Sequence, residues 1–237
     1  MKIQPVGDTA VKLSFSGKAS VEMNRMIRQF CEELDAASIT GLIEWVPAFD
    51  SVTIYYDPWQ VGYEEFKGRM EEIAGKDLSG TRSMSRVVHI PVLYGGEAGP
   101  DLHRVAEHNR LKPEEVIRIH QHPEYLVYML GFLPGFPYLG GLDQRIAAPR
   151  LPEPRPRIEP GSVGIAHEQT GVYPLESPGG WNLIGKTPLR LFDKQKGEEG
   201  FLFQAGDRVK FLSVSEQDFK QIEEQVEHGI YEVYSGG

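Results

Sequence analysis

The chain has 237 residues, enough for one large domain or two of moderate size. Charged residues make up 25% and hydrophobic residues 40%, a composition that excludes disorder for most of the chain. The net charge of −9 and the pI near 5.3 argue against partners such as nucleic acid or an acidic membrane surface. Cys31 is the only cysteine, so an internal disulfide is excluded and a cytoplasmic location is expected. Neither a secretory signal nor a membrane-spanning run is predicted.

The first part of the sequence changes repeatedly between strand and helix periodicity. Apolar residues alternate where strands are expected and recur every three to four positions where helices are expected. Strands are predicted at residues 11–15, 43–46 and 52–56, and helices at residues 23–34 and 63–74. The order β-α-β-β-α is typical of a small α+β sandwich domain, which we assign to residues 1–78.

Residues 79–85 are polar, contain glycine and have no periodicity, so they are predicted to be a linker. A second domain is assigned to residues 86–237. Its expected elements are a strand at 87–92, helices at 101–109, 113–121 and 216–227, and short apolar runs at 125–130, 163–166, 189–192, 201–203 and 209–214. Short runs separated by glycine- and proline-rich turns favour a closed or nearly closed β-barrel.

Residues 180–187 (GWNLIGKT) match the G-x-x-x-x-G-K-[ST] pattern of a phosphate-binding loop. Such a loop needs a buried strand before it and a helix beginning at its Lys-Thr pair, so that backbone N–H groups face the phosphates. Here the loop-like residues 176–179 precede the pattern, and the strand-like residues 188–192 follow it. The context therefore argues against a phosphate-binding loop.

Two histidines, His120 and His122, lie at a predicted helix-to-strand junction. They could share one face of an extended segment, but the sequence supplies no third ligand, so no metal site is predicted. His120 is interpreted as an ordinary polar residue at the end of an element. For His122, which precedes the glycine- and proline-rich segment, a structural role and a role as acid or base are supported about equally.

Four arginines alternate with prolines in the middle of the second domain: Arg145, Arg150, Arg155 and Arg157. A stiff, extended backbone holds guanidinium groups at fixed positions, which suits recognition of a carboxylate or a phosphate. A solvated polyproline connection between strands would have the same composition. The sequence leaves both interpretations open.

Aromatic residues are frequent in the loops that glycine and proline stiffen. They are Phe132, Phe136, Tyr138, Tyr173 and Trp181. Exposed aromatic side chains on rigid loops would line a pocket or a docking face at low entropic cost. Packing at the corners of the barrel would give the same pattern.

Two long motifs, residues 128–142 (YMLGFLPGFPYLGGL) and residues 160–188, stand out in this domain; the second contains PGSVGIA and SPGGWNLIGKTP. With the opening residues 7–10 (GDTA), they resemble the allophanate hydrolase subunit 1 family, whose members are also known as the B subunits of 5-oxoprolinase, over essentially the whole chain. The resemblance implies a small α+β domain followed by a cyclophilin-like β-barrel. It also implies that the chain acts with the A and C subunits of 5-oxoprolinase to hydrolyse 5-oxoproline to glutamate, using ATP. ATP is then expected to bind to the complex as a whole, and the chain is expected to be inactive alone.

The resemblance also assigns candidate site residues by motif position. Substrate- or ATP-binding roles fall on Arg155, Arg157, Gln169, Tyr173, Ser177, Trp181, Asn182 and Lys186. Partner-facing roles fall on Phe132, Phe136 and Tyr138. His122 is the candidate acid or base, and Arg155 or Arg157 would bind a substrate carboxylate or an ATP phosphate. Lys186 stands where the family often has arginine, which preserves the charge but not the bidentate geometry.

A second function from a different class stays open. Some members of the family inhibit a sporulation histidine kinase by binding its dimerisation and phosphotransfer helices. The aromatic loops of this chain could grip such a helical hairpin.

Overall fold

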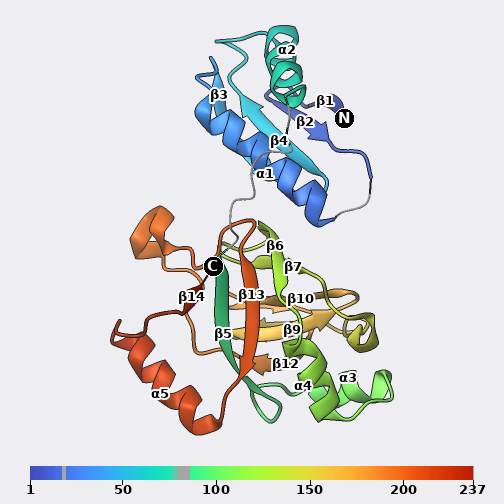
Figure 1. Ribbon diagram of the computed structural model, residues 1–237, viewed down its shortest axis with the longest axis vertical. Helices are drawn as coiled ribbons and strands as arrows, with labels where there is room; N and C mark the ends of the chain where they lie inside the picture. The colour runs from blue at the N-terminus through green and yellow to red at the C-terminus, as the bar shows by residue number, and fades with distance from the viewer. Residues whose placement is uncertain (18–19, 77, 79–85, 237) are drawn as a thin grey trace. The chain divides into compact units, whose positions relative to one another are not determined.

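The computed structural model describes residues 1–17, 20–76, 78 and 86–236. The chain divides into two compact units, Met1–Ser83 and Met84–Gly237, and both are drawn in Figure 1. The linker predicted at residues 79–85 lies outside the described residues.

The first unit is a four-stranded antiparallel sheet with two helices on one face (Figure 1). Its elements are β1 (Lys2–Val6), β2 (Ala10–Ser14), α1 (Val21–Ala36), β3 (Leu42–Pro47), β4 (Ser51–Tyr56) and α2 (Tyr63–Ala74). The strand order is β1-β2-β4-β3. Alternate residues of the central strands, among them Leu13 and Ile54, are fully buried in one core with both helices. The expected helices and strands are all present, and β1 is an additional strand.

The second unit is a closed β-barrel. Its strands are β5 (Val87–Tyr94), β6 (Tyr125–Leu130), β7 (Pro137–Gly140), β9 (Ser162–Ala166), β10 (Gln169–Val172), β12 (Asn182–Lys186) and β13 (Arg208–Ser213). They follow one another in the order β12-β9-β10-β7-β6-β13-β5, and the pairing of β12 with β5 closes the ring. A short strand, β14 (Ser235–Gly236), adds to β5. The expected α+β fold with a cyclophilin-like barrel is confirmed.

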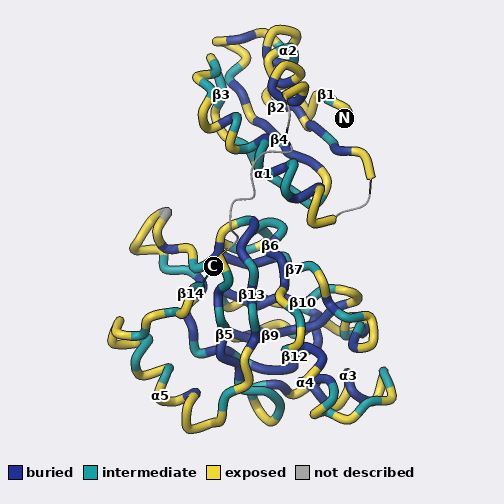
Figure 2. Tube along the Cα trace, viewed as in Figure 1, coloured by how far each residue is buried: buried dark blue, intermediate teal, exposed yellow. Residues whose placement is uncertain are grey.

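Three helices accompany the barrel: α3 (Leu102–His108), α4 (Pro113–Gln121) and α5 (Glu216–Glu227). Apolar residues of α3 and α4 belong to the same hydrophobic core as the barrel strands. Figure 2 shows the buried residues, in dark blue, concentrated along the strands of the barrel. A separate two-stranded ribbon pairs β8 (Arg155–Ile158) with β11 (Ser177–Gly179) and positions the candidate site.

Two of the apolar runs predicted to be strands form no strand. Residues 189–192 and 201–203 flank the 3-10 segment Lys194–Gly200 and are joined by a single bridge between Phe192 and Phe201. Leu189, Leu191 and Phe203 are buried in the barrel core, so their apolar character reflects packing of a loop against the barrel.

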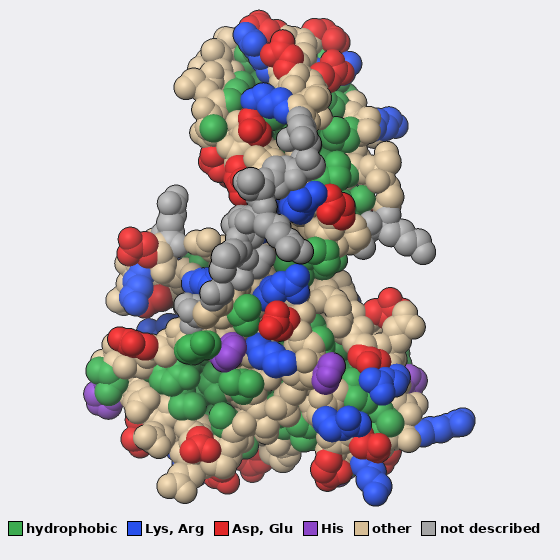
Figure 3. Space-filling view, viewed as in Figure 1, with side chains coloured by type: hydrophobic (Ala, Val, Ile, Leu, Met, Phe, Trp, Pro, Cys, Tyr) green, Lys and Arg blue, Asp and Glu red, His purple; other side chains and the backbone are tan. Residues whose placement is uncertain are grey.

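The outer surface has no large region of one charge on the face drawn in Figure 3, where acidic and basic side chains are interspersed. In the part of the chain that the structure describes, every helix is too short or too polar to cross a membrane.

Candidate functional site

The β8–β11 ribbon and the beginning of β12 bring several predicted site residues to one place. Arg155 opposes Gly179 across the ribbon, and Trp181 and Asn182 follow β11 directly in the chain. The neighbouring backbone of residues 149–151 runs along the same segment, since the Leu151 N–H donates to the Gly180 carbonyl at 2.7 Å. Residues 179–183, called the 179–183 segment below, are therefore the centre of the candidate site.

Arg155 is anchored by a carboxylate from the other side of the segment. Its Nη2 donates to Asp101 Oδ1 at 2.7 Å, and Asp101 Oδ2 accepts the backbone N–H of Leu183 at 2.7 Å. The side chain of Asp101 is 10% exposed and that of Arg155 is 29% exposed. Arg155 Nη1 is buried and has no hydrogen-bond acceptor among the described residues. One terminal nitrogen of the guanidinium is thus fixed, and the other terminal nitrogen is left without an acceptor.

Asn182 is fully buried, and its side chain forms hydrogen bonds within the protein. Its Nδ2 donates to the carbonyl oxygens of Pro149 and Ile165 at 2.9 and 3.0 Å, and its Oδ1 accepts from Arg104 Nε at 3.1 Å. Both donor protons of the amide and one acceptor position are satisfied. Asn182 therefore positions Arg104 and the Pro149 backbone. Its full burial does not support the direct contact with a ligand that the family resemblance implied.

The aromatic residues form a small core centred on Phe136. Its ring lies 5.3 to 5.6 Å from the rings of Phe132, Tyr138, Tyr173 and Trp181, always edge to face. Phe136, Tyr173 and Trp181 are buried, so the expectation that they are exposed is wrong, because they pack on one another beneath the loops. Phe132 is 63% exposed and has a left-handed φ of 67°, and Tyr138 is half-buried. Of the five loop aromatics named above, these are the two whose side chains reach the surface.

The hydroxyl of Tyr173 lies at the centre of the site. Burial raises the pKa of Tyr173 to about 12, while the charges of Arg150 and Arg155 and a hydrogen bond with the Trp181 backbone act in the opposite direction. The phenol is therefore neutral near pH 7 and keeps its proton. A Cβ at Gly179 would come within 2.5 Å of the Tyr173 oxygen, so the close approach of ring and ribbon requires glycine there.

Ser177 is a second group without a partner in this region. The residue is buried, and its Oγ has no hydrogen-bond partner among the described residues. It opposes Ile158 across the ribbon, on the strand that also carries Arg155. A buried hydroxyl without a partner costs free energy, which a bound water or ligand would recover.

The two histidines have opposite environments. His120 is fully buried inside the barrel, where its Nδ1 bonds with the Tyr94 hydroxyl and its Nε2 with Thr170 Oγ1, both at 2.8 Å. Thr170 Oγ1 donates to the Gly164 carbonyl, so it accepts from Nε2–H, and the imidazole is the neutral Nε2–H tautomer. Burial lowers the pKa of His120 to about 3.

His122 is exposed at the end of α4, and its carbonyl oxygen accepts from Lys210 Nζ at 2.6 Å. Within the described residues, no hydrogen bond or ion pair joins it to Arg155 or Tyr173. The structure thus does not bring the predicted acid or base together with the arginine site.

Three further predicted site residues lie away from the 179–183 segment or are paired on the surface. Arg157 is exposed and forms an ion pair with Glu176 at 2.8 Å. Lys186 ends β12 at the far side from Asn182, and its Nζ lies 2.5 Å from Glu159. Gln169 begins β10 opposite Ala166.

Sequence reasoning missed Asp101 and Arg104, which lie three residues apart at the beginning of α3. They contact Arg155 and Asn182, which follow them by 54 and 78 residues. No local pattern reports a contact over that distance. Acidic residues such as Glu153 also lie beside the arginine series in the sequence, so nothing in the series indicated that Arg155 pairs with Asp101.

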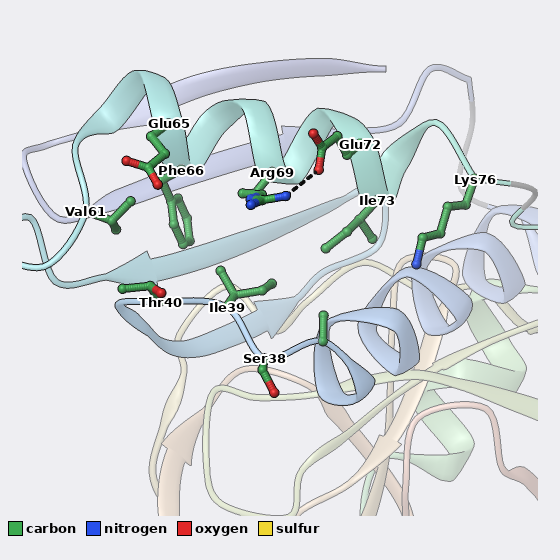
Figure 4. Close-up of a pocket in the computed structure, with 11 residues that line it drawn as sticks. Ser38, Ile39, Thr40, Val61, Glu65, Phe66, Arg69, Glu72, Ile73 and Lys76 are labelled. Atoms are coloured by element: carbon green, nitrogen blue, oxygen red, sulfur yellow. Dashed lines mark hydrogen bonds and ion pairs between the residues drawn. The ribbon is translucent and has the colours of Figure 1, made fainter.

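Among the described residues, metal-ligating side chains do not gather at this site. The structure contains no group of three or more metal-ligating His, Cys, Asp or Glu side chains in residues 1–17, 20–76, 78 and 86–236. A pocket of about 330 Å³ lies in the first unit between α2 and residues 37–40 (Figure 4). Phe66 and Ile73 line it together with Arg69 and Glu72, which form an ion pair of 3.0 Å. None of the predicted site residues lines that pocket.

Comparison with known proteins gives matches over nearly the whole chain. The family model described as carboxyltransferase domain, subdomain C and D, matches residues 1–203. The B subunit of 5-oxoprolinase from Bacillus subtilis (strain 168) is 46% identical over 234 residues, covering 94% of this chain and 97% of that protein. The B subunit of 5-oxoprolinase from Haemophilus influenzae is 41% identical over 212 residues, covering 90% of this chain and 97% of that protein.

Solved structures share the fold within longer chains. TTHA0988 is 38% identical with a TM-score of 0.75, and the match covers 87% of this chain but 40% of that chain. The urea amidolyase of K. lactis superimposes with a TM-score of 0.82 at 18% identity, covering 99% of this chain and 16% of that chain, a likeness that shows the fold alone. The chain thus spans less than half the length of these two solved chains.

Proposed function

The chain belongs to the family of carboxyltransferase domains, subdomain C and D, and from this membership we propose that it is the B subunit of an ATP-dependent 5-oxoprolinase. The observation that carries the proposal is the match to two proteins named as B subunits of 5-oxoprolinase, at 46% and 41% identity and over 97% of the length of each. In this proposal the chain acts in the cytoplasm with the A and C subunits to hydrolyse 5-oxoproline to glutamate. The relatives named above do not favour the alternative of a kinase inhibitor.

The chemistry explains why several subunits and ATP are needed. The lactam of 5-oxoproline is an unstrained amide and a poor electrophile, and phosphorylation of its oxygen would give an activated imidate that water can attack. Our proposal gives this chain a binding and positioning part in the reaction, with no activity when alone. Arg155 is the best candidate for contact with an anionic group, because its Nη1 lacks an acceptor while Arg157 is exposed and paired with Glu176.

A partner subunit is part of the proposal. The match to TTHA0988 covers 40% of that chain, so a protein with this fold can carry much additional polypeptide. Phe132 is the candidate contact for the partner, since it is exposed on a loop that packs against the buried Phe136. Its left-handed backbone conformation is rare for a bulky residue and is held by the surrounding loop.

The test is ATP-dependent formation of glutamate from 5-oxoproline by the purified A and C subunits of the same genome, with and without this chain. We expect activity only when the chain is present. Arg155→Ala should abolish turnover while the complex still assembles, as measured by size-exclusion chromatography. Arg190→Gln is the matched control, because Arg190 is an exposed arginine of the same unit. Full turnover by the A and C subunits alone would refute the proposal.

A further inference from the structure

Three arginines lie on parts of the chain that are bonded to the 179–183 segment. Arg155 opposes Gly179 on the β8–β11 ribbon, and Arg104 reaches from α3 to Asn182. Arg150 lies in the loop that precedes β8. The residues on either side of it are bonded to the segment, through the Pro149 carbonyl to Asn182 Nδ2 at 2.9 Å and through the Leu151 N–H to the Gly180 carbonyl at 2.7 Å.

The shared neighbour of two of these arginines is the Tyr173 hydroxyl. Both Arg150 and Arg155 lie close enough to act electrostatically on the pKa of Tyr173. Arg104 is tied to the same place through Asn182, whose amide bonds to Arg104 and to the carbonyl that precedes Arg150. Hydrogen bonds thus bring the Arg104 side chain and the backbone on either side of Arg150 to the 179–183 segment, and Asp101 joins the Arg155 guanidinium to it, although the three arginines are separated by up to 51 residues in the sequence.

Charge at this place is unbalanced. Asp101 pairs with Arg155 alone, and its second oxygen is used by the Leu183 N–H. In the part of the chain that the structure describes, neither Arg104 nor Arg150 forms an ion pair with a carboxylate, and Arg155 Nη1 has no acceptor. In a chain with a net charge of −9, three arginines with a single ion pair among the described residues give this place a local excess of positive charge.

The donors at this site also exceed its acceptors. Arg104 uses only Nε, so its two Nη groups are available, and the Tyr173 hydroxyl keeps a proton that has no acceptor among the described residues. Guanidinium groups match the geometry of carboxylate and phosphate oxygens and bind them through paired N–H···O bonds. The buried Asn182 and Asp101 hold two of these arginines in place, which lowers the entropy lost on binding.

We propose that Arg104, Arg150 and Arg155, with the Tyr173 hydroxyl, form an oxyanion-binding site on the 179–183 segment. The shared ligand chemistry is a carboxylate or a phosphate group. The inference deepens the proposed function and rests on it for the identity of the ligand, because 5-oxoproline carries the first group and ATP the second. Arg104 and Arg150 are ligand-binding residues, and Asn182 and Asp101 are positioning residues.

The experiment uses the full chain alone in titration calorimetry with 5-oxoproline, ATP and inorganic phosphate as separate probes. We expect saturable binding of one of these anions, weakened at least about tenfold by Arg104→Gln and by Arg150→Gln, because each variant removes charge-assisted hydrogen bonds. Binding of 5-oxoproline alone would assign the site to a carboxylate. Binding of ATP and inorganic phosphate would assign it to a phosphate.

Controls separate this inference from non-specific charge and from the proposed function. Arg190→Gln removes the same charge from the surface and should leave binding unchanged. The inference fails if none of the probes binds at about 10 mM, or if Arg190→Gln weakens binding as much as Arg150→Gln. Turnover by the A and C subunits without this chain would refute the proposed function but leave measured anion binding intact. Strict dependence of turnover on the chain, together with unchanged binding and KM in both arginine variants, would refute the site alone.

Discussion

Removal of the Asp101 carboxylate should loosen the candidate site. Asp101→Ala leaves the buried N–H of Leu183 without an acceptor and Arg155 without its counter-ion. A buried donor that loses its acceptor costs about 1–3 kcal/mol. A fully buried ion pair that loses one partner costs about 3–5 kcal/mol, and an exposed pair about 0.2–1 kcal/mol. Because Arg155 is 29% exposed, we take about 1 kcal/mol for the pair, which gives about 3 kcal/mol in total.

The assay is amide hydrogen exchange of β12, followed by mass spectrometry of peptides that contain residues 182–186. Local exchange is preferable to a single unfolding transition because the chain has two compact units. A loss of about 3 kcal/mol corresponds to exchange about a hundredfold faster. Asp101→Asn should lie between wild type and Asp101→Ala, since an amide oxygen can still accept from Leu183 while the charge is lost.

The matched control is Glu176→Ala. It breaks the Arg157–Glu176 pair, whose side chains are 67% and 53% exposed, and should change stability by less than about 1 kcal/mol. Protection of β12 within a few-fold of wild type in Asp101→Ala would show that Asp101 does not hold Leu183 and Arg155 in place. A similar loss of protection in both variants would attribute the effect to surface charge.

Four other substitutions test the surrounding structure. Gly179→Ala should destabilise the barrel unit by about 1–3 kcal/mol in urea unfolding, because the added methyl would overlap the Tyr173 hydroxyl; wild-type stability would contradict the close approach. The pKa of His120 is about 3 in the folded chain and 6.5 in the unfolded chain, so the unfolded chain binds an additional proton between these pH values. The free energy of unfolding should therefore fall as the pH drops from about 6.5 towards 3, by up to ~1.4 kcal/mol per pH unit. This dependence should vanish in His120→Gln, and parallel stability curves of wild type and variant against pH would disprove it. Phe136→Ala should cost about 3–5 kcal/mol, whereas Phe132→Ala should leave stability almost unchanged and weaken assembly with the partner subunit, measured by calorimetry; equal stability losses would overturn their assignment as core and surface.

Helices were predictable because their signals are local. The limits of α4 and α5 agree with the predicted residues 113–121 and 216–227. Pro113 occupies the first turn of α4, and Ser215 caps α5 by accepting the N–H of Asp218. Each of these signals lies within four residues of the boundary that it marks, so the sequence alone was sufficient.

The ribbon that carries the site was not predictable in the same way. β11 consists of Ser177, Pro178 and Gly179, and proline and glycine are disfavoured in strands. It is a strand only because β8 pairs with it from about twenty residues earlier in the chain. The arginine series was recognised from composition, but only Arg155 and Arg157 lie in β8, where the extended backbone pairs with β11; Arg150 lies in the loop before β8.

Residues 180–187 match a phosphate-loop pattern but do not form a phosphate-binding loop. Most of these residues form β12, whose backbone N–H groups and carbonyls are used in pairing with β9 and β5, and in the described chain no helix follows β12 directly. Backbone N–H groups of this segment therefore cannot cradle a phosphate as those of a loop before a helix do. Lys186 is paired with Glu159 at the opposite end of the strand from Asn182. Recognition of an anion here has to come from side chains. In our proposal Arg104, Arg150 and Arg155 supply them, since Arg104 bonds to Asn182, the residue before Arg150 bonds to Asn182, and Arg155 opposes Gly179.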